Sequence, residues 1–309
     1  MIVTDRRRGL AAALGANLLW GVFPLYFIAI AHVPTVEIIA NRIGLSAILV
    51  TTIILLRGQG PALLRAIGNR QHFWGLVGSA ICITINWGFF AWAVPHGHAL
   101  DASFGYLVNP LVAVLLGFVF LHERLAPNRI VAILFAATGV AALALGRGGI
   151  PWITLILPIS FGLYGLLRKI LAVDAMVGLA VEVLLLAPFA WAWILTRPNG
   201  GALVGEGLGM TGMMLLGAPV TAAPLFLFSY GARRLPLATV GVLQYVSPTI
   251  QMVLATALFG EAFTWADGVA FGLIWVGIGV YWFPVRKGVD NGPATAQIPT
   301  RASGDVAPE

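Results

Sequence analysis

Long apolar runs alternate with short polar or turn-rich segments over almost the whole chain, from about residue 8 to residue 286. Most of these runs approach the roughly 20 residues that a helix needs to cross the hydrocarbon core of a bilayer. The pattern therefore predicts an all-α integral membrane protein with ten transmembrane helices. The expected spans cover residues 9–31, 37–56, 73–95, 99–121, 128–146, 150–168, 175–196, 208–231, 236–260 and 266–285.

The second half of the chain repeats the first at an offset of 138 positions. Pro110 and Pro248 correspond, and each is followed thirteen residues later by a glutamate, Glu123 or Glu261. The same offset superposes Leu116 on Leu254, Val131 on Val269, Ala132 on Ala270 and Gly139 on Gly277. Since each half holds an odd number of spans, the halves must lie upside down relative to one another. We expect two inverted five-helix repeats, 8–146 and 147–286, and a disordered cytoplasmic tail over 287–309.

The basic residues lie almost entirely on one side of this arrangement. Counting Lys and Arg on alternate sides of the ten spans gives fifteen on the side of the two termini and two, Arg147 and Arg197, on the other. Positive residues mark cytoplasmic loops, so both termini are expected in the cytoplasm of a multi-pass protein. The net charge of +6 is thus a topology signal and does not indicate a nucleic-acid partner.

Composition supports the same class. Hydrophobic residues make up 59% of the chain and charged residues 10%, against about 45–50% and about 25% in soluble domains. The single cysteine, Cys82, excludes an internal disulfide and lies in an apolar run. An N-terminal signal peptide is disfavoured, because cleavage would leave the first repeat one span short.

Polar and aromatic side chains recur on single faces of several spans, where lipid would penalise them. These stripes predict a substrate-binding cavity in the middle of the bundle, suited to a partly apolar small molecule with hydrogen-bonding groups. The alternative is that the same side chains only join helices to one another. The candidate binding residues are Trp20, Asn86, Trp92, Tyr106, Asn109, Tyr164, Gln244 and Gln251.

Prolines fall inside several spans, and Pro110 and Pro248 occupy equivalent positions in the two halves. Each proline frees a carbonyl from the helical ladder and permits a kink, so this pair is the candidate for paired hinges. A fixed kink that only shapes the bundle is the alternative.

Two ionisable residues lie within spans. Glu182 is the candidate coupling group for protons, with structural hydrogen bonding as the alternative. Arg42 is expected to extend towards the outer interface, in the direction of Glu37. A direct Arg42–Glu182 pair is disfavoured because inversion places the two residues at different depths.

Signals for other chemistry are weak. His96 and His98 could hold a metal, but no third ligand is near them in the sequence, so a polar loop is favoured. The chain has no His-Glu-x-x-His, Gly-x-Ser-x-Gly or P-loop motif. Neither an enzyme nor a cofactor or metal site is therefore expected.

Several local motifs resemble one known family. Residues 103–110 followed by 120–124 are similar to the fourth span and following loop of the RarD subgroup of the EamA family, within the drug/metabolite transporter superfamily. Further matches occur at Trp20-Gly21, Asn86-Trp87, 164–169, 244–249 and 271–276. The resemblance implies a bacterial inner-membrane permease of ten helices, with two inverted EamA repeats and a site formed by the inner ring of helices. These motifs mark the fold better than the ligand.

Together these patterns favour a secondary-active transporter of a small metabolite or amphipathic drug-like compound, working by alternating access across the cytoplasmic membrane. The expected partners are a small-molecule substrate and the lipid bilayer. A homodimer stays open as an alternative. The rival hypothesis is a non-transport membrane structural or assembly protein.

Overall fold

The computed structural model describes residues 2–122, 126–149, 151–171, 173–232, 234–235 and 243–282. Regular structure in these ranges is helical. The elements are α1 (Ile2–Gly21), α2 (Phe23–Ala29), α3 (Thr35–Leu56), α4 (Gly60–Gly68), α5 (Arg70–Ala93), α6 (Ala99–Leu121), α7 (Pro127–Arg147), α8 (Trp152–Leu171), α9 (Ala175–Leu195), η1 (Pro198–Gly200), α10 (Gly201–Val204), α11 (Leu208–Ala232), α13 (Val246–Val253), η2 (Leu254–Leu258) and α14 (Trp265–Trp282).

The chain is an all-helical membrane protein. Eight helical stretches of the described residues are long and apolar enough to cross a membrane, and two shorter apolar stretches cover 246–258 and 265–281. The predicted spans coincide with these elements to within a few residues at most ends, with α1 and α2 together forming the first. Glu123 and the expected tail, residues 287–309, lie outside the described residues.

The ninth predicted span differs most from expectation. A turn at Gln244 and Tyr245 precedes α13, and α13 continues into the π-helical turn η2. Pro248 therefore lies in the first turn of α13, where a missing N–H costs little. Pro110, by contrast, lies inside the continuous helix α6. Residues 236–242 of this predicted span lie outside the described residues.

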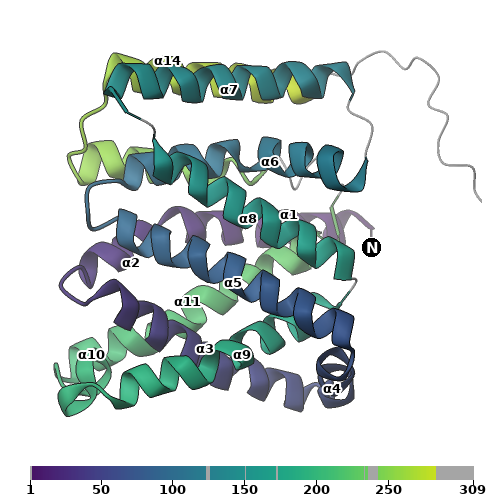
Figure 1. The fold of residues 1–309 in the computed structure, drawn as a ribbon, viewed down its shortest axis with the longest axis vertical. Coiled ribbons are helices and arrows are strands. Elements are labelled where there is room, and N and C mark those ends of the chain that lie inside the picture. Colours follow the sequence, from purple (N-terminus) through teal and green to yellow (C-terminus); the bar gives the residue numbers. More distant parts are fainter. Residues whose placement is uncertain are drawn as a thin grey trace, which may run out of the picture.

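The helices run across the molecule in stacked layers (Figure 1). α7 packs along α14 in the layer drawn at the top, followed by α6 with its neighbours α8 and α13. α3 packs on α9 and α1 on α11. The connections after α2, α5, α7, α9 and η2 gather at one end, named here the Arg147 end; the opposite end, which carries α4 and the start of α1, is the α4 end.

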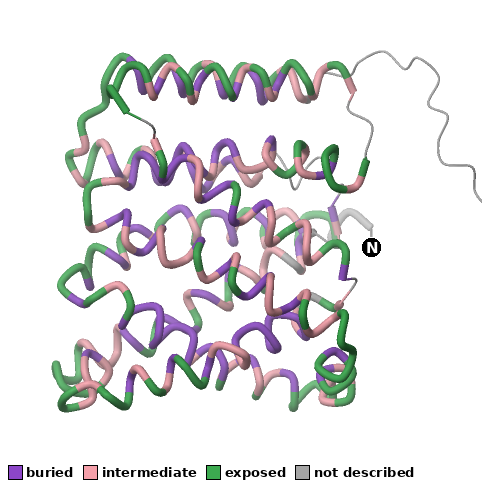
Figure 2. Tube along the Cα trace, viewed as in Figure 1, coloured by how far each residue is buried: buried purple, intermediate pink, exposed green. Residues whose placement is uncertain are grey.

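Burial follows this layering. The core includes Phe27, Phe104, Leu107 and Leu157 from the central helices. α7 and α14 are mostly exposed or intermediate outside the line along which they touch (Figure 2). In a membrane protein such exposed apolar positions face lipid, so exposure here does not indicate a docking surface.

Small residues bring α7 and α14 together in a reciprocal contact. A Cβ built on Gly139 would lie 3.0 Å from the carbonyl oxygen of Ala270, and one built on Gly277 would lie 3.0 Å from that of Ala132. The sequence repeat equates Gly139 with Gly277 and Ala132 with Ala270, so it converts each of these two contacts into the other. Glycine at both positions lets the two backbones approach closely.

Gly277→Leu should therefore destabilise the protein by about 1–3 kcal/mol, because the new side chain meets backbone that cannot move aside alone. The measurement is the apparent midpoint of thermal unfolding in detergent. Gly272→Leu in the same helix is the matched control, since nothing lies within 4 Å of a Cβ at that position. Equal midpoints for the two variants would contradict the close contact.

Candidate functional site

A cavity of about 270 Å³ lies between the central helices. Its walls come from α1, α2, α3 and α5 as well as α6, α8, α9, α11 and α13, so both halves of the chain contribute. The lining residues are Asn17, Trp20, Phe23, Arg42, Ile83, Asn86, Trp87, Phe90, Tyr106, Asn109, Pro110, Phe161, Tyr164, Leu179, Thr221, Leu225, Phe228, Gln244, Ser247, Pro248 and Gln251. Aromatic rings and a few amides dominate this wall, as is usual for a small-molecule site.

Seven of the eight candidate binding residues line this cavity, as do both candidate hinge prolines. Trp92 is the exception. It lies near the Arg147 end, where its ring stacks on His96 with centroids 4.5 Å apart and also meets Trp152. Trp92 therefore belongs to the packing at that end of the bundle, separate from the cavity wall.

Asn86 organises the first-half side of the cavity. Its amide nitrogen donates to the carbonyl of Leu157 at 2.9 Å and to Ser160 Oγ at 3.2 Å. Its amide oxygen accepts from the Tyr106 hydroxyl at 3.1 Å. α5, α6 and α8 are thus tied together at one buried side chain, and the Tyr106 ring also packs on Phe90.

Gln251 has the corresponding role on the side of α13. Its amide nitrogen donates to the Trp20 carbonyl at 3.0 Å and to Ser247 Oγ at 3.3 Å. The carbonyl of Pro248 also has a partner on α6, since it accepts from Ser103 Oγ at 2.7 Å. Two acceptors on the wall, Asn109 Oδ1 and Gln251 Oε1, are buried without a partner among the described residues.

Arg42 is the cavity residue that sequence reasoning misplaced. Its side chain does not extend to the interface or towards Glu37, because it is only 3% exposed and bonds to Thr221 on α11. Glu37 instead accepts from the backbone N–H of Ala202 at 2.5 Å. The sequence signal for a cavity role was the presence of a charged residue inside a span. The guanidinium stays inside the bundle because it packs over the rings of Phe23 and Trp87.

Glu182 is buried on α9, 1% exposed, and does not pair with Arg42. Ser79 Oγ donates to Glu182 Oε1 at 2.5 Å, and Arg168 Nη1 lies 3.5 Å from the same oxygen. Gly178 leaves the space that the Arg168 guanidinium occupies. Glu182 therefore lies behind the cavity wall, next to the lining residue Tyr164 and in an ion pair with Arg168.

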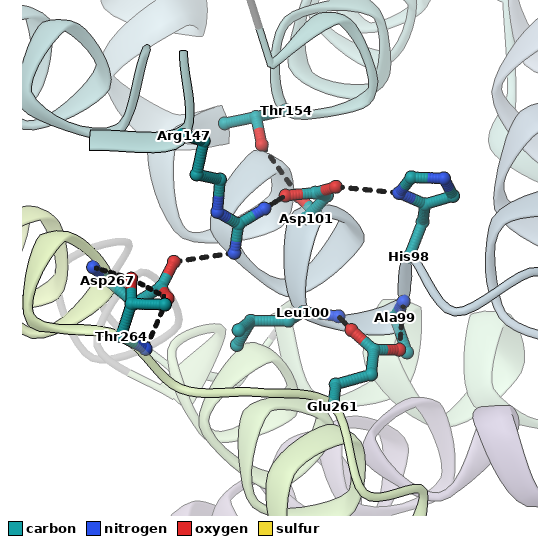
Figure 3. Close-up of polar contacts among 9 residues, drawn as sticks. All are labelled: His98, Ala99, Leu100, Asp101, Arg147, Thr154, Glu261, Thr264 and Asp267. Carbon is teal, nitrogen blue, oxygen red and sulfur yellow. Dashed lines mark hydrogen bonds and ion pairs between the residues drawn. The ribbon is translucent and has the colours of Figure 1, made fainter. Parts of the chain in front are cut away.

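At the Arg147 end, ionic contacts join three helices. Arg147, the last residue of α7, bridges Asp101 on α6 and Asp267 on α14, with the Asp267 contact at 2.5 Å (Figure 3). Asp267 also accepts from the backbone N–H of Thr264 at 2.7 Å, and Asp101 from His98 at 2.9 Å. Sequence reasoning treated Arg147 only as an exception in the charge count, so this bridge was missed.

Glu261 completes the contacts at this end. Its two carboxylate oxygens accept from the backbone N–H groups of Ala99 and Leu100, at 2.7 and 2.8 Å, and so cap the first turn of α6 (Figure 3). An acidic group at a helix N-terminus is favoured by the helix dipole. Burial nevertheless raises the pKa of Glu261 above its ordinary value, while the two amide hydrogen bonds act in the opposite direction.

The histidines of the 96–98 loop bond locally. His96 Nδ1 lies 2.7 Å from the carbonyl of Trp92, and His98 bonds to Asp101. Within the part of the chain that the structure describes, no group of three or more His, Cys, Asp or Glu side chains could hold a metal ion.

Towards the α4 end, the cavity adjoins a second hollow of about 620 Å³. This hollow lies between α3, α8, α9 and α11, and its wall shares Tyr164, Leu179 and Leu225 with the cavity. The bundle is thus tied together by polar contacts at the Arg147 end and hollowed towards the α4 end.

Comparison with known proteins identifies the family of this chain. A model of the EamA-like transporter family matches residues 7–145. An uncharacterized transporter of Pseudomonas aeruginosa is 40% identical over 300 residues, which cover 95% of this chain and 99% of that protein. The chain belongs to the EamA-like transporter family. It is therefore a transporter-family membrane protein and not an enzyme.

Other relatives agree with the EamA assignment. The protein RarD of Escherichia coli is 35% identical over 283 residues, covering 91% of this chain and 96% of RarD. The uncharacterized transporter YojE of Bacillus subtilis is 36% identical over 286 residues, covering 92% of this chain and 96% of YojE. A crystal structure of another protein shares the fold, with a TM-score of 0.58 at 22% identity over 88% of this chain and 94% of that one. The resemblance read from the sequence motifs is confirmed.

Asn86→Leu should lower the free energy of unfolding by about 1–2 kcal/mol, because interhelical hydrogen bonds in membranes contribute about 0.6 and at most about 1.7 kcal/mol each. The measurement is the denaturation midpoint in mixed detergent micelles. Thr84→Val on the same helix is the matched control, since among the described residues the Thr84 hydroxyl bonds only to the Ala80 carbonyl one turn away. A loss in the control as large as in Asn86→Leu would show that the contacts to α6 and α8 contribute nothing.

Proposed function

We propose that the protein is a secondary-active transporter that moves a small metabolite or amphipathic compound across the cytoplasmic membrane by alternating access. The observation that carries the proposal is the central cavity, which is enclosed by helices of both halves and lined by amides and aromatic rings. A bundle serving only as a scaffold has no need for a partly polar cavity at its centre. Trp20, Asn86, Tyr106, Asn109, Tyr164, Gln244 and Gln251 would contact the substrate.

Inverted repeats over 8–146 and 147–286 are part of this proposal. Helix packing supports them, because exchanging the halves converts the helix pairs with the most extensive contacts into pairs that are also observed. The pair α6–α8 corresponds to α13–α1, α5–α8 to α11–α1, and α3–α11 to α9–α5. The pairs α7–α14, α3–α9 and α6–α13 each correspond to themselves.

From the excess of basic residues on the side of the termini we infer that the α4 end lies in the cytoplasm and the Arg147 end outside. With this orientation, the bridge from Arg147 to Asp101 and Asp267 and the cap by Glu261 would close the outer gate. The second hollow, whose wall shares Tyr164 and Leu179 with the cavity, would lead from the cavity towards the cytoplasm. We infer that the structure represents a state closed to the outside, and that Pro110 and Pro248 act as hinges when the gate opens.

Counterflow in proteoliposomes tests the function. A panel of amino acids, nucleosides and amphenicols is offered with and without an imposed pH gradient. At least one compound should exchange, and Gln244→Ala should reduce that exchange at least tenfold, because the amide lines the cavity. An exchange rate that responds to the pH gradient, and loses this response in Glu182→Gln, would support Glu182 as the coupling group. Exchange that Gln244→Ala leaves unchanged would place the substrate elsewhere.

Loosening the outer contacts should expose the cavity to the outside. The cavity is labelled through Tyr106→Cys with an impermeant maleimide added outside. Because Arg147→Gln removes the bridge, labelling should be several-fold faster with Arg147→Gln than in the parent protein that retains Arg147. The parent carries Cys82→Ala, which removes the one native cysteine.

Arg197→Gln is the matched control for this measurement. It removes a charge at the same end of the bundle, but the Arg197 guanidinium stacks on Trp193 of the preceding helix α9, with 4.1 Å to the ring centroid. If Arg147→Gln and Arg197→Gln labelled at the same rate, the bridge would not be the gate.

A further inference from the structure

Arg42 is held inside the cavity wall by neutral groups. Its Nε and Nη2 atoms donate to Thr221 Oγ1 at 3.2 and 3.0 Å. The Thr221 hydroxyl directs its own hydrogen to the Gly217 carbonyl at 2.7 Å, so it can only accept from Arg42. The guanidinium carbon lies 5.2–5.8 Å from the ring centroids of Phe23, Phe27 and Trp87.

The positive charge of Arg42 has no counter-charge among the residues that the structure describes. No described carboxylate lies within salt-bridge distance of it, and the cavity lining includes no Asp or Glu. By contrast, Arg147 contacts two aspartates and Arg168 contacts Glu182. A buried unpaired charge is costly, and rings beside a cation offset only about 0.5–2 kcal/mol of that cost.

Part of the guanidinium remains unused. Nη1 of Arg42 forms no hydrogen bond with any described residue, and the side chain borders the cavity. Two N–H groups of an arginine side chain match the two oxygens of a carboxylate, so this residue type suits an organic acid. The surrounding space is small: a cavity of about 150 Å³ holds benzene, and this one measures about 270 Å³.

We propose that Arg42 is the anion anchor of the substrate site, and that the transported compound is a small organic carboxylate with an apolar body about the size of one or two rings. This inference rests on the proposed transport function. The carboxylate binds the free edge of the guanidinium, and the apolar body packs among Trp20, Phe90 and Phe228. Asn109 Oδ1 and Gln251 Oε1 accept from N–H or O–H groups on that body.

A purely structural role is the competing explanation, in which Arg42 only joins α3 to α11. The two roles differ in what they predict for ligands. A cross-link affects the stability of the free protein, whereas an anion anchor sets the ratio of affinities between an acid and its neutral amide. The test therefore measures that ratio.

Binding is measured by calorimetry with the purified full-length chain in lipid nanodiscs. The probes are benzoate, phenylacetate and indole-3-acetate, each paired with its amide. For at least one pair the acid should bind tenfold or more tightly than the amide, since a hydrogen-bonded charge pair contributes more than a neutral one. Arg42→Gln should remove this preference and leave the affinity for the amide within about threefold.

Two further variants keep the result interpretable. Arg42→Lys retains the charge and should retain part of the preference for the acid. Arg57→Gln removes a positive charge from the residue that follows α3, whose guanidinium stacks on Phe226 outside the cavity wall. This variant should retain all of the preference. Equal or weaker binding of every acid relative to its amide in the wild-type protein overturns the inference, as does a preference that survives in Arg42→Gln.

Counterflow with the same pairs separates this inference from the proposed function. Acids that bind through Arg42 but are not exchanged across the membrane would uphold the anchor and contradict transport. Amides exchanged as fast as acids, with no effect of Arg42→Gln, would uphold transport and contradict the anchor.

Discussion

Inside the hydrocarbon core of a bilayer no water is available as a hydrogen-bond partner, so each polar group in a span must meet another protein group or a hydrated cavity. The distribution of polar side chains in this protein follows from that constraint. The side-chain amide of Asn86 forms hydrogen bonds with three neighbouring groups from α6 and α8. Glu182 is held by Ser79 and Arg168. Two amide oxygens that have no such partner among the described residues, Asn109 Oδ1 and Gln251 Oε1, belong to residues that line the cavity.

The same constraint explains why the two ends of the bundle differ. At the Arg147 end, charges from α6, α7 and α14 meet one another, and Glu261 satisfies backbone donors of α6. Towards the α4 end, the helices leave a hollow beside the cavity. A carrier needs such an asymmetry in any one state, because a path open at both ends would dissipate the gradient across the membrane.

Much of the fold could be predicted from the sequence, because span length and the alternation of charged loops are set by the bilayer. The bounds of α6 agree with the predicted span, and the candidate binding residues other than Trp92 meet at the cavity. Trp92 was predicted to bind substrate, but a tryptophan at the end of a span can equally pack on neighbouring side chains. In this protein its ring packs on His96 and Trp152.

Long-range pairing was the part that sequence alone could not give. The place of Arg42 depends on rings of α2 and α5 and on Thr221, far away in the chain, and no local pattern connects them. The bridge at Arg147 likewise joins residues that are 46 and 120 positions away. Charges were recognised, but their partners could not be identified without the packing of the helices.

The π-helical turn η2 has a consequence for how this segment can change over evolution. It lies between Pro248, which borders the cavity, and Glu261, which caps α6, and the N–H of Glu261 bonds back to the carbonyl of Ala255 at 3.0 Å. A π-turn accommodates one residue more than an α-turn over the same rise. A single-residue deletion inside η2 can therefore be absorbed, because it converts the π-turn into an α-turn and keeps the rise between Pro248 and Glu261. A deletion elsewhere in this segment has no such reserve and would rotate Glu261 away from the first turn of α6.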